Sequence, residues 1–197
     1  RVRHMPGRIT RARSRSVSSA IAELVAAYIN ANSTKRLRVF VDHPVSTDAS
    51  TTSGRKKTSY PDIVVLNSAT EQIEAIADVK TDMGWKRDGV GAACKKLLAL
   101  RKALLKKKSM DLGRDPERRV SYDISKHLSC QLIVSAAANS GAHILSGKGR
   151  GVSKVPVFVL TSGKHPNYFS RMHGNAFEGL TINVKAFREL VRSIDAV

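Results

Sequence analysis

The stretch SYPDIVVLNSATEQIEAIADVK, residues 59–80, contains two short apolar segments on either side of a polar turn. Two such segments joined by a few polar residues predict a β-hairpin. We expect its strands over residues 62–66 and 73–80, with NSATEQ as the connection. If the turn is centred in that connection, the numbers of paired residues sum to about 140 and Asp62 lies beside Asp78, within about 5 Å.

The hairpin carries charges that a strand in a protein core does not favour. Side chains alternate along a strand, so Asp78 and Lys80 share one face. The opposite face is expected to point into the core and contains Ile73, Ala75, Ala77 and Val79. Two neighbouring carboxylates repel each other, and a divalent cation removes this conflict. Hard oxygen ligands suit Mg²⁺, with Mn²⁺ as a substitute. The alternative is a pair of solvated carboxylates on an edge hairpin.

The net charge of the chain points to a polyanionic partner. Lys and Arg number 34 against 16 Asp and Glu, which gives a formal charge of +18. The basic residues are dispersed over the chain, and this distribution favours nucleic acid over an anionic membrane. No apolar run approaches the roughly 18 residues of a membrane span. Cys94 and Cys130 lack metal-site spacing and are expected to be free core thiols, which suits a cytoplasmic protein without membrane association.

The rest of the chain predicts an α/β fold. Residues 1–16 form a basic arm, of which 1–4 resemble a cloning junction, and residues 17–197 are expected to form one domain. Helical spacing of apolar residues predicts helices over 17–32, 89–108 and 184–194. Apolar runs predict further strands over 36–41, 130–137 and 155–161. Polar composition predicts long connections over 43–59 and 109–127. This order favours a central mixed sheet with helices on both faces.

Two features resemble one family of enzymes. Pro61-Asp62 followed by Asp78-Val79-Lys80 resembles the PD-(D/E)XK motif of restriction-endonuclease-like nucleases. The predicted order over about residues 17–137 is also similar to the core of that superfamily, which has a helix, three antiparallel strands, a helix and a further strand. The resemblance therefore implies a restriction-endonuclease-like core.

The resemblance also implies roles for individual residues. Asp62, Asp78 and the carbonyl of Val79 would hold Mg²⁺, and Lys80 would assist the attacking water. Many members carry a glutamate on the first helix that supports the metal site. Glu23 is the position in this chain that corresponds to it.

The function implied by the resemblance is that of a metal-dependent endonuclease that hydrolyses DNA. A small, basic, single-domain chain suits a type II restriction endonuclease, and such enzymes commonly act as homodimers. The candidate DNA-contacting residues flank the hairpin, and they are Arg55, Lys56, Lys57, Lys86, Arg87, Lys95 and Lys96. Two alternatives stay open: a non-catalytic nucleic-acid-binding protein on a nuclease-like fold, and a DNA repair or recombination nuclease.

Overall fold

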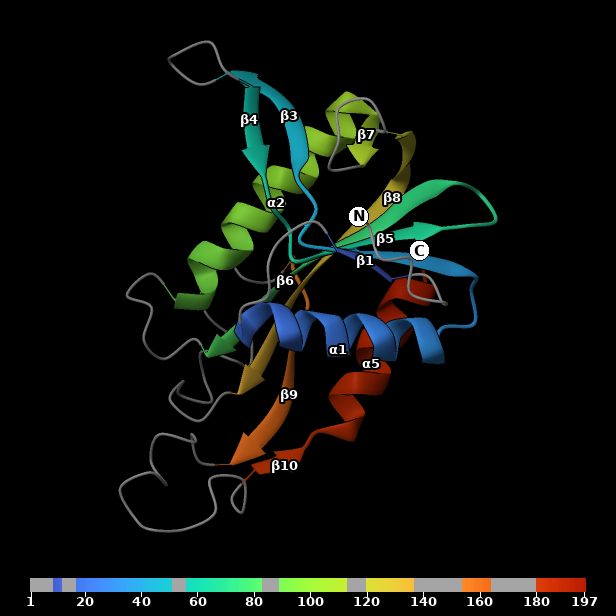
Figure 1. Cartoon of the computed structure of the whole chain (residues 1–197). Helices are drawn as coiled ribbons and strands as arrows, with labels where there is room; N and C mark the ends of the chain where they lie inside the picture. Colours follow the sequence, from blue (N-terminus) through green and yellow to red (C-terminus); the bar gives the residue numbers. More distant parts are fainter. Residues whose placement is uncertain are drawn as a thin grey trace.

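A mixed β-sheet forms the centre of the molecule and takes its strands from the whole length of the chain (Figure 1). The computed structural model describes residues 9–11, 17–50, 56–82, 89–112, 120–136, 154–163 and 180–197. In spatial order, the strands are β1 (Ile9–Arg11), β2 (Leu37–Val41), β5 (Ile63–Asn67), β6 (Gln72–Asp82), β8 (Val120–Ala136), β9 (Val157–Gly163) and β10 (Leu180–Ile182). A further strand, β7 (Ser109–Leu112), pairs with β8.

The strand directions make this sheet mixed. β5 runs antiparallel to both β2 and β6, whereas β8 runs parallel to β6 and β9 parallel to β8. Parallel neighbours need a crossover connection, and α2 (Gly89–Lys107) lies in the connection from β6 to β8. The outer strand β1 pairs in parallel with β2, so three residues of the predicted arm belong to the sheet.

Helices cover both faces of the sheet, as the sequence predicts. α2 buries Val90, Cys94, Leu97 and Leu104 against one face. The opposite face is covered by α1 (Val17–Asn32) and α5 (Val184–Asp195), which pack on β2, β6 and β9. The two cysteines are buried free thiols, also as predicted. Within the described residues, no helix is long and apolar enough to cross a membrane.

Both of the predicted long connections contain strands instead. The segment 43–59 includes β3 (Val45–Ser50) and β4 (Lys56–Ser59), which pair antiparallel and stand beside α2 in Figure 1. The segment 109–127 includes β7 and the first part of β8. Polar composition does not indicate a strand such as β7, because only every second residue of it, Met110 and Leu112, is buried. Such half-buried strands obtain their stability from pairing and packing, which composition does not report.

A β-bulge changes which residues of β6 face each layer. The register between β5 and β6 shifts between Val65 and Leu66, so that Glu74 is an extra residue of β6, and this extra residue reverses the alternation of side chains. Ile73 therefore packs on the α2 side with Ile76, whereas Ala75 packs on the side of α1 and α5. The prediction that Ile73 shares a face with Ala75 is wrong for this reason.

The bulge residue itself is a buried carboxylate with two partners. Glu74 is only 6% exposed. Lys35 Nζ lies 2.8 Å from Glu74 Oε2, and Asn67 Nδ2 donates a hydrogen bond of 2.9 Å to Glu74 Oε1. Lys35 follows α1 in the chain and Asn67 ends β5, so these contacts join the helix layer to the hairpin. A buried ion pair of this kind fixes geometry, since breaking it leaves an unpaired charge.

We expect Glu74→Ala to lower the free energy of unfolding by about 3 kcal/mol, because the Lys35 ammonium and the Asn67 amide lose their acceptor. Urea denaturation measures the change. The matched control is Lys185→Ala, which removes the exposed pair between Lys185 and Glu189 and should cost less than about 0.5 kcal/mol. Equal costs in the two variants would contradict the role given to Glu74.

Candidate active site

The hairpin of β5 and β6 has the register that the sequence predicts. Ile63 pairs with Ala77, Val64 with Ile76, and Val65 with Ala75. The two residue numbers of each pair sum to 140. Extending this register by one residue before β5 places Asp62 opposite Asp78. Because side chains directly opposite each other share a face, both carboxyl groups belong to the face covered by α2.

The backbone holds Asp62 from the neighbouring strand. The N–H of Asp42 donates a hydrogen bond of 3.0 Å to the carbonyl of Asp62. Asp42 has a φ of 55°, a left-handed conformation that aspartate adopts more readily than most residues. The turn after β2 therefore continues the pairing of β2 and β5 by one step and fixes the position of Asp62.

Val79 connects the two aspartates through its peptide groups. Its N–H donates a hydrogen bond of 2.6 Å to Asp62 Oδ2. The N–H and C=O of one strand residue point to the same side of the strand, so the carbonyl of Val79 also points toward Asp62. β6 extends past the first residue of β5, and the carbonyl of Val79 accepts a hydrogen bond of 3.5 Å from Lys80 Nζ. The role of this carbonyl as a third metal ligand stays a prediction.

Lys80 completes the cluster. Its Nζ lies 2.5 Å from Asp78 Oδ1 and 3.7 Å from Asp62 Oδ2. The three side chains are between 12% and 23% exposed, so the cluster is shielded but still open to solvent. The predicted grouping of Asp62, Asp78 and Lys80 is confirmed as geometry.

The two carboxyl groups differ in acidity. The pKa of Asp62 is raised to about 7, mainly by burial and further by the hydrogen bond and negative charge of Asp78, whereas the Val79 N–H and the charge of Lys80 act to lower it. Burial also acts to raise the pKa of Asp78, but the hydrogen bond with Asp62 and the charges of Lys80 and Lys96 outweigh it and lower that pKa. The pair therefore keeps a proton up to a higher pH than two separate aspartates would. Such a separation of pKa values is typical of functional carboxylate pairs.

The donor set suits a hard divalent cation. Two carboxylates and one peptide carbonyl offer oxygen ligands on one side of β6, and Mg²⁺ commonly takes one or two carboxylates and keeps several waters. Over the described part of the chain, no group of three or more His, Cys, Asp or Glu side chains could hold a metal ion. A metal here would therefore depend on Asp62, Asp78, the Val79 carbonyl and water.

Glu23 lies on the helix that covers the other face of the sheet. It is half-buried on α1, next to Ala22 in the chain, and the buried face of that helix packs against the layer that contains Ala77 and Val79. The carboxylate pair belongs to the opposite face. Ala22, Val25 and Ile29 occupy the inward side of α1. The predicted role of Glu23 stays a prediction.

The predicted DNA-contacting residues have different positions. Lys95 and Lys96 are exposed on α2, and the positive charge of Lys96 acts on Asp78. Lys56 and Lys57 belong to β4. Arg55, Lys86 and Arg87 lie outside the described residues.

A hollow beside the aspartates was not predicted from the sequence. It lies between the end of β4 and the first half of α2, and it is lined by Ser59, Tyr60, Pro61, Asp78, Lys96, Leu97 and Leu100. Two sequence signals could have indicated it. Tyr60 directly precedes the Pro61-Asp62 motif, and residues 96, 97 and 100 of α2 have the spacing of one helical face.

Comparisons with known protein families, with characterised proteins and with solved structures find no match for this chain. A proposal for its function must therefore come from the chemistry of the Asp62, Asp78 and Lys80 cluster and from the charge of the surface around it.

Proposed function

We propose that this protein is a metal-dependent endonuclease with a restriction-endonuclease-like core that hydrolyses phosphodiester bonds in DNA. The proposal depends on one observation. Asp62 and Asp78 share a face of the sheet with Lys80, whose ammonium lies within 3.7 Å of both carboxylates. A cation-binding carboxylate pair with an adjacent ammonium can activate water and stabilise a phosphate that gains negative charge.

Each residue of the cluster has a task in this reaction. Asp62 and Asp78 bind the cation, and the Val79 peptide orients Asp62 through its N–H. When bound, Mg²⁺ lowers the pKa of a coordinated water and polarises the phosphate. Lys80 orients the attacking water and stabilises the charge on the phosphate. The raised pKa of Asp62 means that this carboxyl must lose its proton before it binds a cation tightly.

The order of elements supports the fold assignment. α1 is followed by β2, β5 and β6, then by α2 and by β8 parallel to β6. β2, β5 and β6 form an antiparallel unit. The small hairpin of β3 and β4 is an insertion in that order. A type II restriction endonuclease acting as a homodimer is the finer form of the proposal, because two sites are needed to cut both strands of a palindrome.

A stripe of lysines on α2 supports DNA as the partner. Lys95, Lys102 and Lys106 are exposed, and their spacing of seven and four residues places them on one side of the helix. A rise of 1.5 Å per residue separates the first from the last by about 16 Å. The stripe begins one residue from Lys96, which lines the hollow beside Asp78. It can therefore contact the phosphate backbone next to the cutting site.

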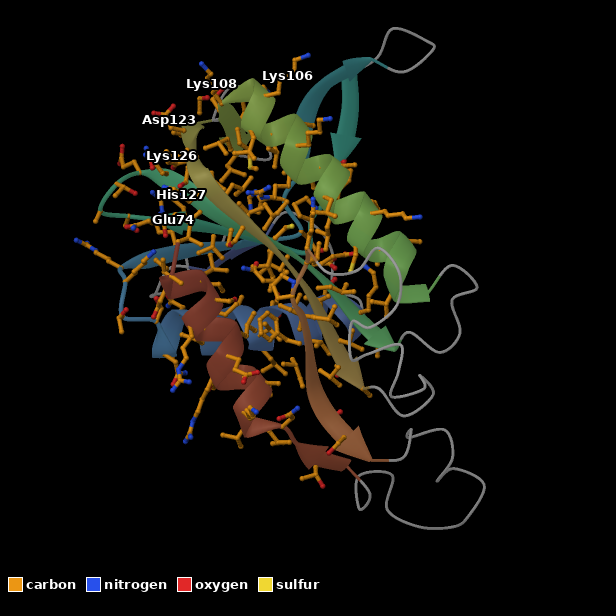
Figure 2. The ribbon with its side chains drawn as sticks, turned by 180° about the vertical axis from the view of Figure 1, so that it is seen from behind. Glu74, Lys106, Lys108, Asp123, Lys126 and His127 are labelled. Atoms are coloured by element: carbon orange, nitrogen blue, oxygen red, sulfur yellow. The ribbon has the colours of Figure 1, made fainter. Side chains whose placement is uncertain are left out.

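The positive surface continues beyond the end of α2. Figure 2 shows Lys106 and Lys108 there, with Asp123, Lys126 and His127 of β8 along the same edge. The N–H of Ile124 donates a hydrogen bond of 2.7 Å to the carbonyl of Lys108, which joins the two elements. Lys108 and Lys126 are both exposed. We infer that a duplex follows α2 from the carboxylate pair toward this end of the molecule.

Replacing Lys95, Lys102 and Lys106 together by alanine should weaken DNA binding most strongly at low salt. The slope of log affinity against log salt is negative, and each lost phosphate contact reduces its magnitude by about 0.9, or by about 2.7 for three contacts. Fluorescence anisotropy of a labelled duplex in EDTA, at about 50 to 200 mM salt, measures the slope without cleavage. Lys185→Ala, on α5, is the matched control and should keep the wild-type slope. An unchanged slope in the triple variant would exclude this path for the DNA.

Incubation of supercoiled plasmid with the protein and Mg²⁺, Mn²⁺ or EDTA tests the function itself. We expect nicked and linear products only with a divalent cation. Discrete fragments from phage DNA support a restriction endonuclease, and a smear favours a repair or recombination nuclease. DNA binding without cleavage under any divalent cation would leave the non-catalytic alternative.

A further inference from the structure

Strand β8 contains a bulge near the C-terminal end of α2. Between the pairs Ile73–Ile124 and Ala75–Ser129, four consecutive residues of β8 stand against a single residue of β6. We call this four-residue segment, 125–128, the β8 bulge. Bulges interrupt the regular alternation of a strand and redirect its side chains, and they are common next to functional sites.

Both ends of the β8 bulge are held inside the protein. Ser125 is 6% exposed and Leu128 is fully buried. The N–H of His127 donates a hydrogen bond of 3.2 Å to the hydroxyl of Ser125, which is a local turn typical of serine. Arg101 of α2 donates a hydrogen bond of 2.5 Å from Nε to the carbonyl of Leu128. The two residues between these ends are therefore presented on a rigid support.

The middle of the β8 bulge is exposed and carries hydrogen-bond donors. Lys126 and His127 are both exposed, and Figure 2 shows them on the same edge of the molecule as Lys108 and Asp123. Among the described residues, neither Lys126 nor His127 forms a salt bridge with a carboxylate. Lysine offers three N–H donors, and neutral histidine offers one donor and one acceptor. These groups can therefore bind a ligand without first breaking an ion pair.

The distance from the β8 bulge to the carboxylate pair follows from strand geometry. Asp78 lies four residues after Glu74, the residue of β6 opposite the bulge, and a rise of about 3.3 Å per residue gives about 13 Å. The step to the neighbouring strand adds about 4.8 Å sideways, so the direct distance is about 14 Å. Along a duplex, with about 3.4 Å per base pair, this distance corresponds to about four base pairs.

We propose that the β8 bulge is a base-reading element, in which Lys126 and His127 enter a groove of the duplex and contact base edges about four base pairs from the cut. The inference rests on the proposed nuclease function and adds the residues that select the DNA sequence. The rigid support favours base edges over phosphates, because base readout needs donors at defined positions, whereas the lysines of α2 can follow any backbone. Lysine pairs with O6 and N7 of guanine in the major groove, so the contacted position should be a G·C pair.

Selection from a pool of DNA duplexes with a random central segment tests this role without cleavage. The protein is mixed with the pool, with Ca²⁺ in place of Mg²⁺, and the duplexes that it retains on a filter are sequenced. We expect the wild type to enrich a sequence that contains a G·C pair. Lys126→Ala and His127→Ala should each lower the preference for that sequence over the pool by about tenfold, with little change in affinity for the pool as a whole.

A matched control separates base readout from phosphate binding. Lys108 is exposed on the same edge but lies outside the bulge, so Lys108→Ala should weaken the binding of all duplexes alike and leave the enriched sequence unchanged. Circular dichroism and the retained affinity for the pool show that each bulge variant is folded.

The outcomes also distinguish this inference from the nuclease proposal. A wild-type protein that enriches no sequence, or bulge variants that keep the wild-type preference, would overturn the base-reading role even if the protein cuts DNA. A preference that is lost in both bulge variants, in a protein that never cuts DNA, supports the base-reading role and overturns the nuclease.

Discussion

Asp78→Asn and Lys80→Ala should each abolish most DNA cleavage while leaving DNA binding nearly intact. Asp78→Asn removes the negative charge that would bind the cation and that pairs with Lys80 at 2.5 Å, so we expect a loss of about 10³-fold or more in the cleavage rate. Lys80→Ala removes a cation from the reacting phosphate, with an expected loss of about 10²- to 10³-fold. Single-turnover cleavage of a plasmid with excess protein measures both rates.

Controls separate chemistry from folding and from affinity. Glu189→Gln changes an exposed carboxylate on α5 and should keep the wild-type rate. Anisotropy in EDTA should give affinities for DNA within about threefold of wild type for the Asp78 and Lys80 variants, because neither residue belongs to the lysine stripe of α2. If Asp78→Asn cleaves DNA at the wild-type rate, the carboxylate pair takes no part in catalysis, whatever the rate of Lys80→Ala.

Local sequence patterns are sufficient for the elements that carry their own apolar periodicity. The helix over 17–32 and the hairpin register summing to 140 depend on nearest neighbours in the chain, and both agree with the structure. The strands β3 and β7 lack such a signal. Met110 and Leu112 are buried only because β7 pairs with β8 in the folded chain. The bulge at Glu74 likewise depends on partners in other elements, such as Lys35.

In the candidate site, too, the residues of one local element could be predicted, whereas contacts between distant elements could not. Asp62, Asp78 and Lys80 belong to one hairpin, so strand alternation and register place them together before any tertiary contact is known. The hollow joins Tyr60 to Leu97 and Leu100 across the crossover to α2, and no local pattern specifies how that helix packs. Glu23 shows the same limit, since helical periodicity describes α1 but not which face of the sheet the helix covers.

Asp62→Asn should stabilise the protein at pH 8. The asparagine side chain resembles the protonated carboxyl group, so its oxygen can accept from the Val79 N–H and its amide can donate to Asp78. The pKa of Asp62 is raised from 3.8 to about 7, so the folded state holds this proton more tightly than the unfolded state. The stability that the proton provides is present below about pH 4 and is lost as pH rises through about 7.

The size of this effect follows from the pKa difference. At about 1.4 kcal/mol for each pKa unit, the upper limit is about 4 kcal/mol, and we expect a gain of about 2 kcal/mol for Asp62→Asn over wild type at pH 8. Urea denaturation between pH 5 and pH 8 should show the gain growing with pH. Asp195→Asn is the matched control with the opposite sign, because hydrogen bonds from Ser33 and Thr34 outweigh burial and lower the pKa of Asp195.

The same variant separates metal binding from the mere removal of charge. At pH 8 both aspartates of the wild type are largely ionised, and a bound cation stabilises the folded state in proportion to the logarithm of its concentration. We therefore expect Mg²⁺ or Mn²⁺ to raise the melting temperature of wild type and to leave that of Asp62→Asn almost unchanged. An equal rise of the melting temperature in both proteins would mean that the cation binds elsewhere. The carboxylate pair would then destabilise the fold with no bound cation to compensate.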